Sequence, residues 1–289
     1  KLLYVAPVVT FINLTSKLSF IFSVYSRSIV STYPLGIYST CLLAQTYMNY
    51  AQFGVLNAYN RDYPQALGRK DYDTARKLKN TTVTFMLMVY AAIFVVFETW
   101  VLVHYHGSIG NDTYQTYYAF GYMMCPILIL LKSFDDMSNT TVRMNGMYNY
   151  SAIVGFIRTI IALAIGVGAL NLFGYYGLYG MTVASSALGI ILFYKNSLKG
   201  ARLEFDFPYM KVMILGGLPL LINSLIWTLV QSVDKFVILG FLDTEALGVY
   251  SVPLMGFTTM VLIPQTISQV FYIKISHLYE ASGDVDECL

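Results

Sequence analysis

Long apolar stretches recur along the chain, and their lengths fit helices that cross a membrane. A spanning helix needs roughly 20 mostly apolar residues, whereas open strands would leave backbone groups unpaired in lipid. The pattern therefore predicts an all-α polytopic membrane protein with about eight transmembrane helices, at residues 3–26, 35–57, 80–103, 114–134, 149–170, 176–194, 211–240 and 247–271.

Three local signals refine this pattern. The polar stretch after the fourth predicted helix indicates that this helix continues toward Arg143. Pro219 lies inside the seventh and predicts a kink, because proline removes a backbone donor and clashes with the preceding turn. The basic segment 61–79 is expected to anchor the topology, with an interfacial helix capped by Asp71, and a contact with lipid headgroups is the alternative.

The composition agrees with a membrane protein and excludes several other classes. Of the 289 residues, 56% are hydrophobic and 12% are charged, whereas soluble domains contain about 25% charged residues. The net charge of +2 is too small to indicate a nucleic-acid partner. The three cysteines share no short spacing, so neither a disulfide framework nor a metal site is indicated. No nucleotide-binding or hydrolase motif is found, and we expect no cofactor.

The distribution of Lys and Arg predicts the orientation of the chain. If the N-terminus lies inside, the inner segments hold 14 of the 18 cations and the outer segments hold only Arg27. The remaining three, Lys17, Arg158 and Lys235, lie inside predicted helices. Because Lys and Arg concentrate in cytoplasmic loops, this asymmetry predicts a multi-pass protein of the cytoplasmic membrane with a cytoplasmic N-terminus.

A short internal repeat predicts two related halves. Residues 33–39 (Tyr-Pro-Leu-Gly-Ile-Tyr-Ser) and 245–251 (Glu-Ala-Leu-Gly-Val-Tyr-Ser) are identical at four of seven positions. Both follow a predicted helix on the outer side, which fits a six-helix unit repeated in parallel orientation, as in some transporters. We therefore expect an N-terminal six-helix lobe at 1–200 and the first two helices of a second lobe at 201–289, as a fragment of a transporter with 12–14 helices.

Polar residues inside the predicted helices are the candidate functional residues. Arginine at the centre of a membrane helix costs about 2.5–3.5 kcal/mol on insertion scales, so Arg158 requires water or a counter-charge. Asp135, Asp136 and Asp234 are its candidate partners, and a structural salt bridge remains an alternative to a wet cavity. Asn and Gln can equally join helices by hydrogen bonds. The candidate substrate-binding residues are Asn13, Lys17, Gln45, Arg158, Gln231, Asp234 and Lys235.

These residue types favour an anionic substrate. Arg and Lys bind phosphate and diphosphate well, so a cavity lined by cations suits such a group. A buried carboxylate such as Asp234 could instead bind a proton or a sodium ion and couple transport to an ion gradient.

Residues 61–75 (Arg-Asp-Tyr-Pro-Gln-Ala-Leu-Gly-Arg-Lys-Asp-Tyr-Asp-Thr-Ala) look like the first cytoplasmic loop of the polysaccharide-export flippases of the Wzx type. The superfamily of these flippases also contains the MATE drug antiporters. Residues 27–39 are similar to the first outer turn of these flippases, and 174–180 to the approach to their sixth helix. Residues 234–251 resemble the start of their second lobe, and 273–281 the loop that follows. The order and spacing of these segments carry the resemblance.

The resemblance implies a fold and a function. The fold has two six-helix lobes around a central cavity. The activity is the flipping of an undecaprenyl-diphosphate-linked oligosaccharide across the bacterial inner membrane by alternating access, for surface polysaccharide such as O-antigen in lipopolysaccharide. A polysaccharide polymerase complex is the implied protein partner. Cationic cavity residues would meet the diphosphate or acidic sugars, and only Lys17, Arg158, Asp234 and Lys235 can be offered here, by position.

Other functions remain open. A MATE-type drug antiporter shares the fold but would favour a cavity lined by carboxylates, whereas the deep charges of the first lobe are basic. A membrane polymerase or ligase would need a large outer loop with catalytic Arg or His, and the outer loops are short. We therefore expect no enzyme. A non-transporting assembly protein of the same fold is the third alternative.

Overall fold

The described part of the chain is helical. The structure, a computed structural model, describes residues 19–107, 112–254, 256–258, 260, 261 and 264. Within these residues no strand occurs, and a further helical segment begins at residue 244. The long helices are α2 (Ser19–Ile29), α3 (Thr32–Met48), α4 (Val55–Gly68), α5 (Tyr72–Tyr105), α6 (Thr113–Met144), α7 (Tyr148–Phe173), α8 (Gly180–Phe193) and α9 (Phe207–Phe241), and the short 3-10 turns are η1 (Asn49–Gln52), η2 (Gly174–Tyr179) and η3 (Tyr194–Asn196).

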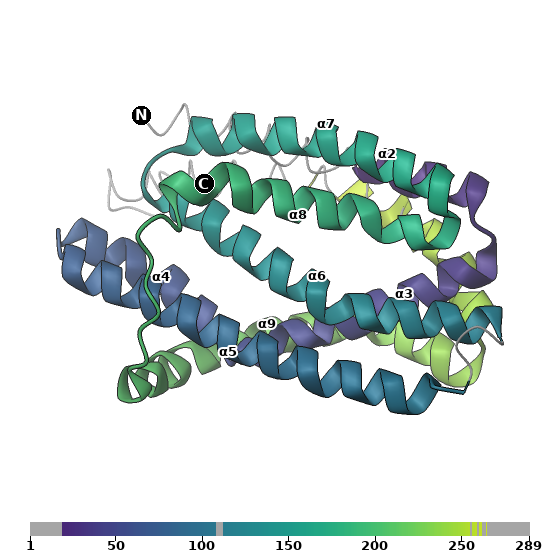
Figure 1. Cartoon of the computed structure of the whole chain (residues 1–289), viewed down its shortest axis with the longest axis horizontal. Coiled ribbons are helices and arrows are strands. Elements are labelled where there is room, and N and C mark those ends of the chain that lie inside the picture. Colours follow the sequence, from purple (N-terminus) through teal and green to yellow (C-terminus); the bar gives the residue numbers. More distant parts are fainter. Residues whose placement is uncertain (1–18, 108–111, 255, 259, 262–263, 265–289) are drawn as a thin grey trace, which may run out of the picture.

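Four stretches are long and apolar enough to cross a membrane: Tyr72–Tyr105, Thr113–Met144, Tyr148–Asn196 and Phe207–Phe241. The third stretch contains both α7 and α8, which lie side by side because the chain reverses at η2 (Figure 1). The prediction of an all-helical multi-pass membrane protein is thus confirmed. Of the first predicted span only residues 19–26 are described, and of the last only 247–254, 256–258, 260, 261 and 264, so the count of eight spans stays a prediction.

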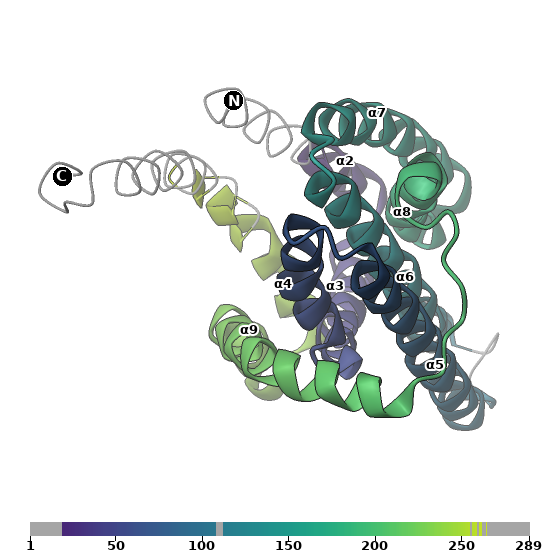
Figure 2. The ribbon, with the colours of Figure 1, turned by 90° about the vertical axis from the view of Figure 1, so that its left-hand side faces the viewer.

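The helices pack as a bundle with a continuous order of neighbours. Helix α2 lies on α7, α7 on α8 and α8 on α6, while α6 also contacts α3 and α5. Helix α4 packs against α5 on one side and against α9 on the other, so α9 lies at the edge of the bundle (Figure 2). Large apolar side chains remain exposed on the outer helices, as expected for surfaces that face lipid; they include Val103, Leu172 and Phe241.

The prediction of one continuous helix at 35–57 is wrong. Helix α3 ends at Met48, and α4 begins only at Val55. Between them Phe53 and Gly54 have φ angles of 49° and 80°, which end a helix because they belong to the left-handed region. A Cβ at Gly54 would also overlap the backbone of Gly217 in α9. The break therefore brings the backbones of two helices into contact.

The local signals read from the sequence have different outcomes. Helix α6 extends to Met144, as the polar stretch predicted. The Asp71 carboxylate accepts hydrogen bonds from the Thr74 amide at 3.0 Å and from the Thr74 hydroxyl at 2.7 Å. Asp71 is therefore a helix cap, as expected, but the helix that it caps is α5 itself and not a separate interfacial helix. Pro219 lies inside α9, and its kink remains a prediction.

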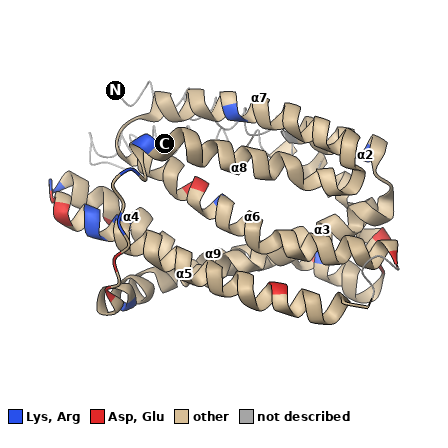
Figure 3. Ribbon diagram, viewed as in Figure 1, with Lys and Arg blue, Asp and Glu red and all other residues tan. Residues whose placement is uncertain are grey.

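Charged residues are unevenly distributed along the bundle. Figure 3 shows most of the Lys and Arg at the end where α4, the start of α5 and the start of α9 lie, while the helical middle is mainly apolar. This end contains the segments that the sequence assigns to the cytoplasm. The orientation in the membrane remains a prediction.

Candidate functional site

Four charges lie well inside the lengths of α6 and α7, and we call them the deep charge layer. These helices are antiparallel neighbours joined by residues 145–147, and each carries charges well inside its length. The charges are Lys132, Asp135 and Asp136 on α6 and Arg158 on α7. Ionisable groups at such a depth are costly in lipid and usually functional or paired.

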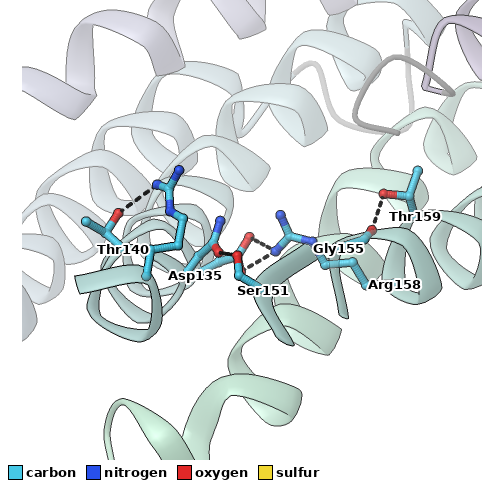
Figure 4. Close-up of polar contacts among 8 residues, drawn as sticks. Asp135, Thr140, Ser151, Gly155, Arg158 and Thr159 are labelled. Carbon is cyan, nitrogen blue, oxygen red and sulfur yellow. Dashed lines mark hydrogen bonds and ion pairs between the residues drawn. The ribbon is translucent and has the colours of Figure 1, made fainter. Parts of the chain in front are cut away.

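Arg158 and Asp135 form an ion pair within this layer. The Arg158 Nη1 atom lies 2.5 Å from Oδ1 and 2.6 Å from Oδ2 of Asp135 (Figure 4). The side chains are only 18% and 7% exposed. The Arg158 guanidinium carbon also lies 5.9 Å from the centre of the Phe193 ring, a contact that favours a cation over an aromatic face.

A glycine on a third helix makes room for the pair. A Cβ at Gly189 of α8 would overlap both the Asp135 carboxylate and the Arg158 guanidinium. The pair is therefore enclosed by α6, α7 and α8. Of the three candidate counter-charges for Arg158, the structure selects Asp135, and the structural salt bridge that the sequence left open is the geometry observed.

Lys132 and Asp136 lie at the same level but remain exposed. They are separated by four residues, so they occupy the same face of α6. Their side chains are exposed, unlike Asp135. The sequence counted Lys132 among the inner cations and predicted that its helix runs on past it toward Arg143. The structure places Lys132 well inside α6, as a further deep cation.

Hydroxyl groups join α9 to α3 and η1. The Tyr47 hydroxyl hydrogen-bonds to Ser232, and the Tyr50 hydroxyl hydrogen-bonds to Thr228 and donates to the Ser224 carbonyl at 3.0 Å. Sequence reasoning missed this face of α9. The sequence does contain a signal for this face, because Ser224, Thr228 and Ser232 recur every four positions. Small polar residues are common where membrane helices meet.

Other polar residues of α9, among them the predicted candidates Gln231, Asp234 and Lys235, lie beside this contact face. Asn223, Trp227 and Gln231 are exposed. Asp234 is half-buried and accepts a hydrogen bond from the Tyr250 hydroxyl at 2.5 Å. Lys235 is half-buried too.

The remaining candidates are not brought together with these residues. Gln45 is buried in α3, at 8% exposure. Asn13 and Lys17 lie outside the described residues. Arg158 pairs with Asp135 of α6, whereas Asp234 of α9 bonds to Tyr250, so the structure places these two charges in different contacts.

The two copies of the internal repeat pack against each other. A Cβ at Gly36 would overlap the backbone carbonyl of Thr244, and a Cβ at Gly248 would overlap that of Thr32. Each threonine precedes the glycine of its own copy by four residues, so the contacts are reciprocal. Reciprocal contacts of this kind are characteristic of two units related by a two-fold axis.

Residues 63–289 match the family described as "Polysaccharide biosynthesis protein". The chain belongs to the polysaccharide biosynthesis protein family. The match covers most of the chain and confirms the family-level resemblance to polysaccharide-export proteins that the sequence segments predicted. No curated protein and no solved structure matches the chain.

Family membership fixes the broad role and the membrane setting. The protein takes part in polysaccharide synthesis or export, and its long apolar helices make it a multi-pass membrane protein.

Proposed function

We propose that this protein is a flippase that moves an undecaprenyl-diphosphate-linked oligosaccharide from the inner to the outer leaflet by alternating access. The product would serve the synthesis of a surface polysaccharide, such as O-antigen in lipopolysaccharide. In this proposal the protein is a transporter in the bacterial inner membrane, not an enzyme, and delivers its substrate to a polysaccharide polymerase complex.

The observation that carries the proposal is the reciprocal packing of the repeat copies around Gly36 and Gly248. Parallel repeats related by an axis along the membrane normal are a common plan of transporters, whose substrate site lies between the repeats. A contact of backbone on backbone at one end of such an axis would allow two lobes to rock against each other. Membership in the polysaccharide biosynthesis family supports the substrate class.

The deep charges support an anionic substrate. Lys132 is exposed on α6, and Lys235 is half-buried on α9, which belongs to the predicted second lobe. Lysine is a good partner for phosphate groups. We assign the diphosphate to these lysines together with Lys17, and we include Gln231 and Asn13 as further polar groups of the proposed site. Arg158, which is held by Asp135, and Gln45, which is buried in α3, are assigned no direct contact with the substrate. Asp234 is the proposed group for a coupling proton or sodium ion.

Complementation tests this function. The full-length gene is expressed in a strain that lacks its own flippase for lipid-linked oligosaccharides, and surface polysaccharide is compared at matched protein levels. Wild type should restore the polysaccharide, and Lys132→Ala should reduce it, whereas Lys195→Ala, a change of the same kind at the charged end of the bundle, should not. Failure of wild type with every oligosaccharide type would contradict the proposal and favour a drug antiporter or an assembly protein.

A further inference from the structure

A basic cavity lies at the charged end of the bundle, apart from the deep charge layer. Its volume is about 470 Å³, and it is enclosed by the end of α4, the first turns of α5 and the linker before α9. The residues of α5 and of the linker that line it include four cations: Arg76, Lys79, Lys199 and Arg202. None of the described residues that line it is acidic.

Hydrogen bonds hold the linker against α5 and so bring these cations together. The Lys79 ammonium donates to the Ser197 carbonyl at 3.3 Å. The Asn80 side chain accepts from the Arg202 amide at 3.1 Å and donates to the Glu204 carboxylate at 3.2 Å. These hydrogen bonds, made by the Asn80 side chain and by the Lys79 ammonium itself, hold the linker against α5 without a ligand.

The charges in this cavity are not compensated by carboxylates within the described part of the chain. The ion pairs found there join Arg61 to Asp62, Lys77 to Asp206, and Arg158 to Asp135, and none includes the four lining cations. Cations that converge in this way repel one another, so an anion between them is stabilising. Arg and Lys together suit a phosphate group, since guanidinium binds its oxygens in pairs and ammonium adds a point charge.

The position of the cavity fits a lipid headgroup. Helix α5 is polar through its first turns and becomes apolar from Val83 onward, so the cavity lies where the apolar part of the helix begins. Tyr63 and Tyr72 line it as well, and tyrosine favours the boundary between membrane and water. Basic pockets between membrane helices at the cytoplasmic surface are known to hold anionic headgroups.

We propose that this cavity binds the phosphate of an anionic phospholipid headgroup and that the bound lipid joins α5 to the linker. This goes beyond the proposed flipping of a lipid-linked oligosaccharide, since the site shares no residue with the deep charge layer. The lipid chains would run along the apolar part of α5, while the phosphate bridges Arg76 and Lys79 on one wall to Lys199 and Arg202 on the other.

Binding measurements on the full-length protein in neutral detergent test the proposal. The probes are short-chain phosphatidylglycerol, short-chain phosphatidylcholine and inorganic phosphate. The variant Arg76→Gln/Arg202→Gln changes the cavity, and Arg69→Gln/Lys211→Gln removes the same charge from the same end outside it. Phosphatidylglycerol should bind wild type saturably. In the cavity variant its dissociation constant should rise at least about tenfold, because the loss of hydrogen bonds to charged groups costs that much affinity. The control should change it less than about twofold.

Each other result would overturn a part of the proposal. Equal weakening by the control variant would show a diffuse surface attraction, and equal binding of phosphatidylcholine would show that net charge is irrelevant. Displacement of the lipid by inorganic phosphate at the same concentration would identify a site for a soluble anion. The variant Arg76→Lys/Arg202→Lys keeps the charge and guards against misfolding as the cause: it should retain lipid binding, and its loss of binding would contradict the electrostatic basis.

Discussion

The Arg158–Asp135 pair shows how single residues are accommodated inside this bundle. Removing two charges from water is expensive, and their attraction offsets that cost only when geometry is good. Here one guanidinium nitrogen contacts both carboxylate oxygens, and Gly189 leaves the space that the pair occupies. The pair therefore matters chiefly because either charge alone would be left buried without a partner.

Changing one member of the pair should destabilise the protein much more than changing both. We expect Arg158→Met or Asp135→Leu alone to lower the free energy of unfolding by about 3–5 kcal/mol, because each leaves one buried charge. The double variant should recover most of that loss. Unfolding of all four proteins in one detergent measures the coupling. Additive losses in the double variant would contradict a direct pairing.

The sequence could predict only part of this residue-level picture. An arginine within an apolar run indicated a counter-charge, and Asp135 was among three candidates. Choosing between them required the packing of α6 against α7, which no local pattern contains. The polar end of α6 did predict that the helix continues past Lys132 toward Arg143, and it ends at Met144.

At the scale of elements, glycines set the closest approaches between helices. Gly36 and Gly248 permit the reciprocal contact of the two repeat copies, and Gly54 and Gly217 permit the contact of the α3–α4 break with α9. The repeat could be read from the sequence. The break could not, because Phe53 is not a residue that favours positive φ, and the conformation of Gly54 is tied to contact with a distant helix.

A methyl group should disrupt the repeat contact. Gly36→Ala and Gly248→Ala each place a Cβ on the backbone of the other copy, so we expect a loss of about 1–3 kcal/mol, as for other overpacked sites. Gly168→Ala in α7 is the matched control, because a Cβ there meets nothing within 4 Å. The control should be stabilised by roughly 0.5–1 kcal/mol through helix propensity. Thermal unfolding in detergent measures all three, and equal behaviour of the three would refute the contact.

The linker contact between Lys77 and Asp206 should depend on pH. The Lys77 ammonium lies 2.7 Å from the Asp206 carboxylate. The hydrogen bond from the Lys77 ammonium lowers the pKa of Asp206 most, and the hydrogen bond from the Tyr209 amide lowers it further. A lowered pKa in the folded state stabilises the contact above the ordinary carboxyl pKa of about 3.9. This stabilisation is lost as the pH falls through the lowered value.

Hydrogen exchange of residues 197–206 measures this effect. Asp206→Asn should exchange faster than wild type at neutral pH, and the difference should fade in acid, below about pH 4. Asp73→Asn, a change at an exposed acid in the first turn of α5, is the control and should match wild type. A difference that is absent at neutral pH would contradict the contact, and one that persists undiminished well below pH 4 would contradict its titration.

At the scale of the whole molecule, the family and the architecture point to the same role. The family match indicates polysaccharide synthesis or export. The bundle contains several apolar helices and a pseudo-symmetric contact between the two repeat copies. The all-helical membrane fold could be predicted from hydrophobic pattern alone, since that pattern is set by the bilayer. The substrate site could not, because its residues would come from helices far apart in sequence whose facing surfaces depend on packing.

Direct flipping of the lipid-linked oligosaccharide is the measurement that tests the account best. The full-length protein is reconstituted in vesicles that contain a fluorescent undecaprenyl-diphosphate-linked oligosaccharide, and a quencher that cannot cross the membrane is added outside. We predict that the inner-leaflet signal becomes quenched in vesicles with wild-type protein, and more slowly with Lys132→Ala. Quenching no greater than in protein-free vesicles, with folded protein present, would contradict the account.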